Sequence, residues 1–293
     1  MSIFLITGIS GSGKSVALNA LEDAGYDCVD NLPINLLENL IADLSQSGIE
    51  KLAIAIDARR GKSIIELPEI LSKLAKSYNV QLIFLNSSTE SLVKRFSETR
   101  RRHPLSNAKN ENPQNSLIEA IQLERDLMKG LNELGHQIDT SNISANTLRA
   151  WVLDLIQHQH SGLTLLFESF GFKHGLPQDA DLVFDVRCLT NPFYDLSLRP
   201  LTGNDEAVVE FLLKNSDFLD LAKDIESFIK KWLPKYMLDQ RSYLTIAIGC
   251  TGGQHRSIAM ANYLFNQFVE QSKSPDNRLS LLLRHREITI ASN

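Results

Sequence analysis

Short apolar runs and helix-periodic segments alternate through the first half of the chain. The apolar runs predict strands at 2–7, 26–30, 51–57, 80–85 and 136–139. Between them, apolar residues that recur every three or four positions predict helices at 16–24, 34–47, 63–78, around 92–96, at 117–134 and at 145–157. Strands that alternate with helices favour a parallel sheet with helices on both faces, so we expect one mononucleotide-binding α/β domain over residues 1–158.

The second half of the chain has a related pattern. Strand-like runs lie at 163–172 and 180–189, a helical pattern covers 204–232, and 243–270 again predicts a strand, a glycine loop and a helix. The stretch HQHSG at 158–162 is typical of a linker. We therefore predict a second α/β domain over residues 163–293, with an anion-binding loop of its own.

Composition narrows the class of protein. The chain has 293 residues, of which 43% are hydrophobic and 22% charged, and its net charge of −5 gives no global attraction to nucleic acid or anionic lipid. The longest apolar runs are too short to span a bilayer, and no basic leader precedes them. Cys28, Cys188 and Cys250 lack the spacing of zinc or disulfide sites. We expect a cytoplasmic protein with reduced thiols and no membrane segment.

The N-terminal glycine loop carries the first candidate chemistry. Gly8, Gly13, Lys14 and Ser15 match the phosphate-loop motif G-x-x-x-x-G-K-[ST], with a predicted strand before it and a predicted helix after it. Glycines let backbone N–H groups turn around phosphates, Lys14 would reach the β and γ oxygens, and Ser15 would be a Mg²⁺ ligand. The motif therefore predicts nucleotide binding, with Lys14 and Ser15 in catalytic roles.

Three further polar features are expected near this loop. Asp57 ends a predicted strand, where it would hold the water shell of Mg²⁺ as a catalytic carboxylate; a solvated strand-end aspartate is the alternative. Asp30 has the same edge position and is either the base of a small-molecule kinase or a helix N-cap. The cations of RRRH at 100–103 either close over a nucleotide or form a solvated helix end.

The second glycine loop, GCTGGQHRS, favours binding of a phosphate group. Amides at Thr251, Gly252 and Gly253 precede a predicted helix and would form an anion nest, with His255 as a hydrogen-bonding ligand. Arg256 would grip a phosphate through two N–H groups. A purely structural turn is the alternative.

The same loop is also compatible with a phosphatase. Cys250 and Arg256 have the C-x₅-R spacing of cysteine-dependent phosphatases, in which a thiolate attacks the phosphoryl group. Asp195 is the available candidate for a general acid. Three function classes are therefore open: a nucleotide-binding regulator, a small-molecule kinase and a cysteine phosphatase.

Five stretches carry a family resemblance: ITGISGSGKS, DNLP, FESFGFKHGLPQDADLVFDVRCLTNP, LRPLTG and IGCTGGQHRS. Through them the sequence closely resembles the RapZ/YvcJ family of bacterial P-loop nucleotide-binding proteins over nearly its whole length. The resemblance implies a regulatory protein with a kinase-like P-loop domain and modest ATPase and GTPase activity, with Mg²⁺ held through water by Ser15 and Asp57. The implied ATP contacts are Gly8, Ile9, Ser10, Gly11, Ser12, Gly13, Lys14 and Ser15, and the implied GTP contacts are Asp57, Ala58, Arg59 and Arg60.

Some members of this family resemble RNase adapters, which bind small regulatory RNA, work with an endoribonuclease and respond to an amino-sugar phosphate. The resemblance implies that this phosphometabolite binds at Thr251, Gly252, Gly253, His255 and Arg256. The C-terminal segment 273–293 carries four cations against two acids, which favours RNA contacts at Lys273, Arg278, Arg284 and Arg286. We expect a homo-oligomer that presents several such tails to one RNA.

Overall fold

The computed structural model divides the chain into two compact units, Met1–Gln157 and His158–Asn293. The residues that it describes are 1–57, 66–106, 113–131, 134–157, 162–238, 243–272 and 279–288. Each unit has a sheet and a hydrophobic core of its own.

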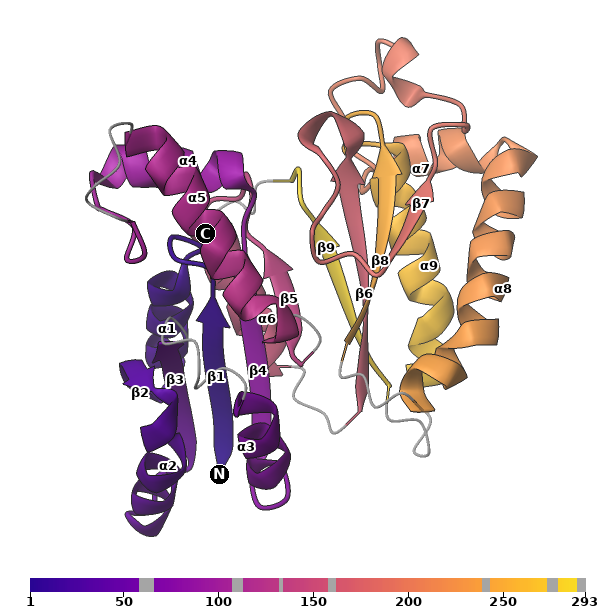
Figure 1. The fold of residues 1–293 in the computed structure, drawn as a ribbon. Helices are drawn as coiled ribbons and strands as arrows, with labels where there is room; N and C mark the ends of the chain where they lie inside the picture. The colour runs from indigo at the N-terminus through magenta and orange to yellow at the C-terminus, as the bar shows by residue number, and fades with distance from the viewer. Residues whose placement is uncertain are drawn as a thin grey trace. The chain divides into compact units, whose positions relative to one another are not determined.

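The N-terminal unit is built on a parallel five-stranded sheet in the order β2-β3-β1-β4-β5 (Figure 1). The strands are β1 (Ser2–Gly8), β2 (Asp27–Pro33), β3 (Lys51–Asp57), β4 (Asn79–Asn86) and β5 (His136–Asp139). In the central strand β1, Ile3, Phe4, Leu5 and Ile6 are all at most 1% exposed. Because neighbouring strand residues point to opposite faces, this burial means that both faces of the sheet are covered.

Helices provide that cover. They are α1 (Lys14–Asp23), α2 (Leu37–Gln46), α3 (Leu67–Leu74), α4 (Thr89–Thr99), α5 (Pro113–Met128) and α6 (Ala145–Gln157), with the 3-10 turns η1 (Ile34–Leu36) and η2 (Lys129–Leu131). Helix α1 packs beside α6 and against β1 and β3, and α4 packs beside α5. The predicted α/β fold, with a helix-covered parallel sheet and a second α/β domain, is confirmed. The glycine loop connects β1 to α1 at the carboxyl edge of this sheet.

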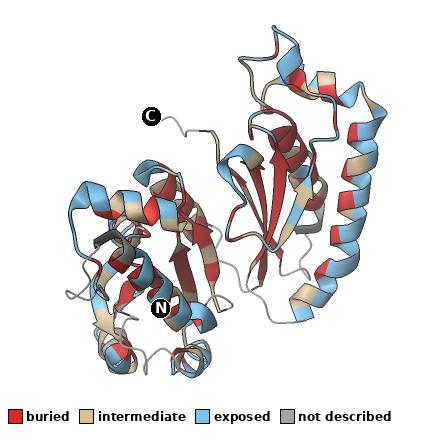
Figure 2. Cartoon of the chain, turned by 45° about the horizontal axis from the view of Figure 1, so that its top comes forward, coloured by how far each residue is buried: buried red, intermediate tan, exposed pale blue. Residues whose placement is uncertain are grey.

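The C-terminal unit has a parallel sheet of four strands in the order β7-β8-β6-β9. Its elements are β6 (Leu163–Gly171), η3 (Phe172–His174), β7 (Leu182–Asp185), η4 (Pro192–Tyr194), α7 (Glu206–Leu213), α8 (Ser216–Leu238), β8 (Tyr243–Cys250), α9 (Arg256–Ser272) and β9 (Leu279–His285). Strand β6 is buried along its whole length, and α9 packs against β6, β8 and β9 (Figure 2). The second glycine loop connects β8 to α9.

Several element boundaries differ from the sequence prediction, and the differences at α8 and β2 have a visible cause or consequence. Helices α7 and α8 replace the single helix predicted at 204–232, because the Asn215 side chain accepts from the Asp217 amide at 3.0 Å and starts a new helix. Strand β2 continues to Pro33 through an irregularity in its pairing with β3 between Val29 and Leu32. The extension brings Asp30 and Asn31 to the edge of the sheet that carries the glycine loop.

Candidate functional site

The phosphate-loop motif depends on glycine at two positions for its shape. Gly8 has φ 142°, and a Cβ there would overlap the backbone of Leu85 on β4. Gly13 has φ 106°, and a Cβ there would lie 2.7 Å from Leu148 Cδ2. Other side chains are strained in this backbone region, so the glycines fix a loop that passes close to its neighbours.

Arg95 of α4 and Thr140 hold the loop by hydrogen bonds to its backbone carbonyl groups. Arg95 Nη1 donates to the Gly11 oxygen at 3.1 Å and to Thr140 Oγ1 at 3.0 Å, and Thr140 Oγ1 donates to the Ser12 oxygen at 2.9 Å. Because a peptide N–H points away from the C=O of the same unit, these bonds turn the Gly13 amide away from Thr140. Neither residue was predicted from the sequence. Burial lowers the pKa of Arg95, which nevertheless stays charged at neutral pH.

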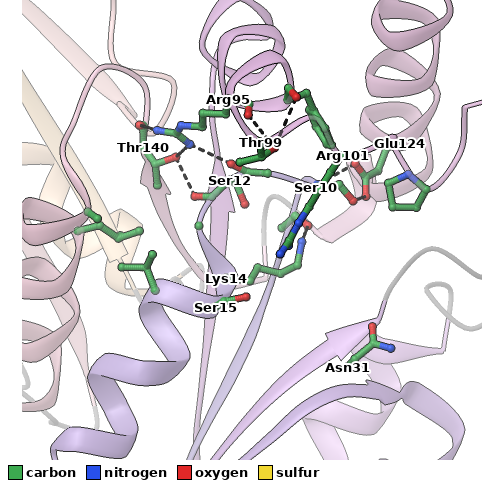
Figure 3. A pocket seen from close by; sticks show the side chains of 18 of the residues that line it. Ser10, Ser12, Lys14, Ser15, Asn31, Arg95, Thr99, Arg101, Glu124 and Thr140 are labelled. Atoms are coloured by element: carbon green, nitrogen blue, oxygen red, sulfur yellow. Dashed lines mark hydrogen bonds between the residues drawn. The ribbon is translucent and has the colours of Figure 1, made fainter.

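The loop opens on a cavity of about 590 Å³ (Figure 3). Its walls include loop residues 10–16, Asp30 and Asn31 at the end of β2, and Arg101 and Arg102 after α4. The volume lies within the range of small-molecule sites. The structure therefore brings together the loop, Asp30 and the predicted arginine cluster, three features that are separate in the sequence.

The predicted loop residues take different places. Lys14 lies over the loop, with Nζ 2.6 Å from the Gly8 oxygen and 3.2 Å from the Ile9 oxygen. Ser15 lines the cavity. The side chain of Ile9 is 1% exposed and belongs to the core, so only its backbone is available to a ligand.

Glu124 of α5, which was not predicted from the sequence, lies beside the loop (Figure 3). Its carboxylate is buried and accepts from the Ser10 amide at 2.8 Å and from Ser10 Oγ at 2.7 Å. The same carboxylate lies 3.1 Å from His103 Nε2. Burial would raise the pKa of Glu124, but hydrogen bonds from His103 and Ser10 and the nearby charge of Lys14 lower it overall. The carboxylate is therefore ionised at neutral pH.

Several predicted site residues lie outside the part of the chain that the structure describes. Asp57 ends β3, next to Ile56, which lines the cavity, but the side chain of Asp57 is not among the described parts. The other residues in this group are Ala58, Arg59, Arg60, Lys273 and Arg278.

In the C-terminal glycine loop, a backbone amide is hydrogen-bonded to a side chain of the same loop. The Gly253 amide donates to Cys250 Sγ at 3.2 Å, and Ser257 Oγ lies 3.2 Å from the same sulfur. The predicted anion nest needs correction at this position, because the Gly253 amide is already used. Thr251 is exposed and Gly252 is half-buried, so these two positions are open to a ligand.

Arg256 is anchored rather than free. Its Nη1 donates to the Arg187 oxygen at 2.8 Å and to the Leu189 oxygen at 3.0 Å, and its Nη2 donates to Thr251 Oγ1 at 3.3 Å. The residue is only 4% exposed. These bonds hold the guanidinium with its Nη2 next to the Thr251 hydroxyl, so a bidentate grip could use only Nη2 and Nε.

Glu287, which follows β9, packs against this loop and was also not predicted. A Cβ on Gly253 would lie 2.6 Å from Glu287 Oε2, so the carboxylate occupies the space that the glycine leaves. Burial raises the pKa of Glu287, although a hydrogen bond from the Gly171 amide and the charges of Arg286 and Lys173 oppose the shift. A carboxyl group thus lies beside each of the two glycine loops, buried at Glu124 and half-buried at Glu287.

The phosphatase alternative does not fit this geometry. The Cys250 thiol is 3% exposed, and Arg256 is occupied with backbone carbonyls. Asp195 accepts from Ser197 Oγ at 2.6 Å and from the Ser197 amide at 2.9 Å, and these bonds lower its pKa. A carboxylate that holds its charge in this way is a poor general acid.

The prediction of RNA contacts from a solvated tail is wrong for Arg284 and Arg286. Residues 279–285 form strand β9, which pairs with β6, because the apolar run LSLLL enters the sheet. Arg284 is 2% exposed. The Arg286 side chain is 8% exposed, and its Nη1 lies 3.6 Å from Glu168 Oε1. Both arginines are thus components of the fold.

Neither a metal-binding cluster nor a membrane-spanning helix is found among the described residues. Among the described residues, no three His, Cys, Asp or Glu side chains are grouped to hold a metal ion. Every helix in the described ranges is too short or too polar to cross a bilayer. The three cysteines are free: Cys28 is half-buried, Cys188 exposed and Cys250 buried.

Comparison with known proteins assigns the chain to a family. The model of the RapZ-like N-terminal domain matches residues 1–159, and the model of the RapZ C-terminal domain matches residues 163–289. The chain belongs to the RapZ family. Both halves of the chain are thus accounted for by one family.

Curated relatives cover nearly the whole chain. A nucleotide-binding protein of Polynucleobacter asymbioticus is 58% identical over 288 residues, which are 98% of this chain and 97% of the relative. A nucleotide-binding protein of Paraburkholderia xenovorans is 54% identical over 294 residues, 99% of this chain and 97% of the relative. Among solved structures, shikimate kinase from Bacteroides thetaiotaomicron is 12% identical with a TM-score of 0.36, and the match covers 53% of this chain and 96% of that chain.

Proposed function

We propose that the N-terminal unit binds ATP or GTP through the loop Gly8–Ser15 and hydrolyses it slowly in a regulatory role. The observation that carries the proposal is the cavity, which is lined by the loop with Lys14 and by Arg101 and Arg102. Backbone amides and cations that face one cavity suit a polyphosphate chain. The name shared by the curated relatives, nucleotide-binding protein, supports the same conclusion.

The residues present also fit a Mg²⁺ ion bound with the nucleotide. Ser15 Oγ lines the cavity and has no hydrogen-bond partner among the described residues, so it is available as a ligand. Asp57 would complete the site through water, and the ion would neutralise phosphate charge. In this proposal residues 57–60 supply the contacts to GTP.

Lys14→Ala tests the nucleotide site. We expect hydrolysis of ATP and GTP to fall about a hundredfold or more and binding to weaken, because the variant loses the cation at the phosphates. Lys94→Ala, on the exposed side of α4 and away from the cavity, is the matched control and keeps both properties. Phosphate release and titration calorimetry measure the effects. Wild-type hydrolysis in Lys14→Ala contradicts the proposal.

A small-molecule kinase is the second candidate, because Asp30 and Asn31 face the same cavity. Asn31 has φ 56°, a conformation that is uncommon for a residue other than glycine and is often found at functional sites. Asp30 would act as the base for an acceptor hydroxyl. Release of ADP that depends on an added hydroxylated acceptor, and that is lost in Asp30→Asn, distinguishes this function from nucleotide sensing.

We propose that the C-terminal unit binds a phosphorylated amino sugar at the loop Thr251–Arg256. Two buried nitrogen atoms in this loop, His255 Nε2 and Arg256 Nε, have no hydrogen-bond partner among the described residues. Such atoms are rare in folded proteins and mark places where a ligand or water belongs. The amino-sugar part of the proposal rests on the family resemblance.

Calorimetric titration with an amino-sugar 6-phosphate and with the unphosphorylated sugar tests this site. The wild-type protein should bind only the phosphorylated compound. Thr251→Val should weaken binding about tenfold, because it removes the hydroxyl beside Arg256. Cys250→Ser should keep binding, since the thiol has no chemical role in the proposal. Equal binding of both sugars contradicts it.

The adapter role, with small regulatory RNA and an endoribonuclease as partners, stays a proposal from the family resemblance, as does the homo-oligomer. The cytoplasmic location stays a proposal from the composition of the sequence. With Arg284 and Arg286 in the fold, Lys273 and Arg278 are the remaining predicted contacts in the tail. Replacing both by alanine should reduce the slope of log K against log salt concentration for a single-stranded RNA region by about 1.4. Filter binding at several salt concentrations measures this slope, and an unchanged slope contradicts the assignment.

A further inference from the structure

The carboxylate of Glu124 accepts hydrogen bonds from part of the phosphate loop. Both Ser10 donors, the amide and the hydroxyl, are directed at the Glu124 carboxylate at 2.8 and 2.7 Å. A buried N–H group needs an acceptor, and in phosphate loops the backbone amides donate hydrogen bonds to phosphate oxygens. The Glu124 carboxylate therefore accepts from the Ser10 amide, a donor of the kind that would otherwise bind a phosphate of the ligand.

The neighbouring histidine does not cancel the charge of this carboxylate. The Leu105 amide donates to His103 Nδ1 at 3.2 Å, so the ring proton lies on Nε2 and the neutral ring donates to Glu124. The positive charges of Lys14 and Arg125 both act on the Glu124 carboxylate, and of these two residues Lys14 belongs to the loop. Lys14 is also the residue that reaches the β and γ phosphates in this motif. A bound polyphosphate and Glu124 therefore compete for one ammonium group.

We propose that Glu124 is a specificity-determining residue that makes the site discriminate against the third phosphate of a nucleotide. Its fixed negative charge repels the additional phosphate charge and competes with it for Lys14, so that without Mg²⁺ a nucleoside diphosphate binds at least as tightly as the triphosphate. Mg²⁺ offsets the repulsion by neutralising phosphate charge. This inference rests on the proposed nucleotide site.

Glu124→Gln isolates the charge from the geometry. The amide oxygen of glutamine can take the place of Oε2, which accepts from both the Ser10 amide and His103. The amide nitrogen then takes the place of Oε1 and donates to Ser10 Oγ, because a hydroxyl can accept as well as donate. All three contacts are kept, and only the negative charge is lost.

The test is calorimetric titration of the full chain with ADP and with ATP, in EDTA and in excess Mg²⁺. In EDTA, Glu124→Gln should strengthen ATP binding relative to ADP binding by about tenfold, the effect of removing one like charge from a partly desolvated site. In Mg²⁺ the change should be smaller. Glu119→Gln, an exposed position of the same helix that does not line the cavity, is the matched control and should leave the ratio unchanged.

Each result decides the proposal. If Glu124→Gln binds both nucleotides in an unchanged ratio, Glu124 does not discriminate between them. If the variant fails to fold, the wild-type protein still gives an answer, because ATP binding more than about tenfold tighter than ADP binding in EDTA contradicts the proposal. If the wild-type protein binds neither nucleotide under any condition, the nucleotide site itself is absent, a failure that is distinct from an unchanged ratio.

Discussion

The two glycine loops begin from the same local pattern, a buried parallel strand that runs into glycines and then a helix, yet they differ in what they leave free. The loop between β1 and α1 opens on a cavity of about 590 Å³, and Arg95 donates a hydrogen bond to one carbonyl group of this loop. In the loop between β8 and α9, the Gly253 amide is turned to Cys250 Sγ and Arg256 is anchored on backbone carbonyls. Which loop is open is thus decided by side-chain contacts, made by the distant Arg95 at the first loop and by the neighbouring Cys250 and Arg256 at the second.

The carboxyl groups of Glu124 and Glu287, one beside each loop, also differ between the two loops. Hydrogen bonds outweigh burial at Glu124 and lower its pKa, whereas burial dominates at Glu287 and raises its pKa. An anionic ligand therefore meets a fixed negative charge in the first loop. In the second loop it meets a carboxyl group that accepts a proton more easily.

Glycine replacement should give the largest difference between the loops. Gly8→Ala should destabilise the N-terminal unit by about 4 kcal/mol, because the Cβ overlaps the Leu85 backbone and the residue has φ 142°. Gly252→Ala should change stability by less than about 0.5 kcal/mol, since its Cβ would meet only Lys173 Nζ at 3.9 Å. Urea unfolding measures both. Equal losses would show that the loops are constrained alike.

Acid should weaken the C-terminal unit before the N-terminal one. Burial lowers the pKa of His285 to about 4, from 6.5. The neutral ring therefore contributes stability above pH 6.5, and about 3 kcal/mol is lost as the pH falls through about 4. The pKa of Glu124 is lowered from 4.5, so its contribution is lost only below that pH.

Urea unfolding between pH 7.5 and 5, followed with single-tryptophan variants that retain Trp151 in α6 or Trp232 in α8, separates the two units. His285→Asn keeps a hydrogen-bonding partner for Ser169 Oγ and should remove most of the pH dependence of the C-terminal unit. A pH dependence that survives in this variant would assign the effect to other groups.

Removal of the anchored arginine should have a smaller effect. Arg256→Met should destabilise the C-terminal unit by about 2 kcal/mol, because the Arg187 and Leu189 carbonyls lose a charged donor. Arg199→Met, which removes an exposed arginine stacked on Phe193, is the control and should cost less than about 1 kcal/mol. Thermal unfolding measures both. If the Arg256 variant is as stable as the control, the anchoring bonds contribute little.

Thiol reactivity gives the smallest and simplest comparison. Cys188 is exposed and should react first with a maleimide, whereas burial and the charges of Glu22 and Asp27 raise the pKa of Cys28 to about 11. Cys250 should react last, because its sulfur is buried and accepts from Gly253. Mass spectrometry of timed samples gives the order. Early labelling of Cys250 would show that the second loop opens in solution.

The sequence predicts the elements well and their neighbours poorly. Alternation of strands and helices, with the G-x-x-x-x-G-K-[ST] motif, was enough for the α/β class and the place of the loop. The strand order depends on pairing between distant segments, which local periodicity does not contain. The same holds for Arg95 and Thr140, which contact the loop from about 80 and 130 residues further along the chain.

Two missed features did leave a signal in the sequence. Glu124 lies in the apolar stripe of its helix, between Ile121 and Met128, and a glutamate in such a stripe indicates a buried polar contact. The run LSLLL at 279–283 is typical of a buried strand, but the cations around it favoured a solvated tail. In both cases the burial of a charged residue depended on partners elsewhere in the fold.

Hydrogen exchange of the full-length protein in the presence and absence of Mg²⁺ and ATP tests the central claim most directly, namely that the N-terminal loop alone is the nucleotide site. We predict slower exchange in peptides that contain residues 8–15 and 99–106, since bound phosphate would order the loop and the segment that carries Arg101 and Arg102. Peptides that contain residues 250–257 should exchange at unchanged rates. Protection of residues 250–257 by ATP, without protection of residues 8–15, would contradict the account.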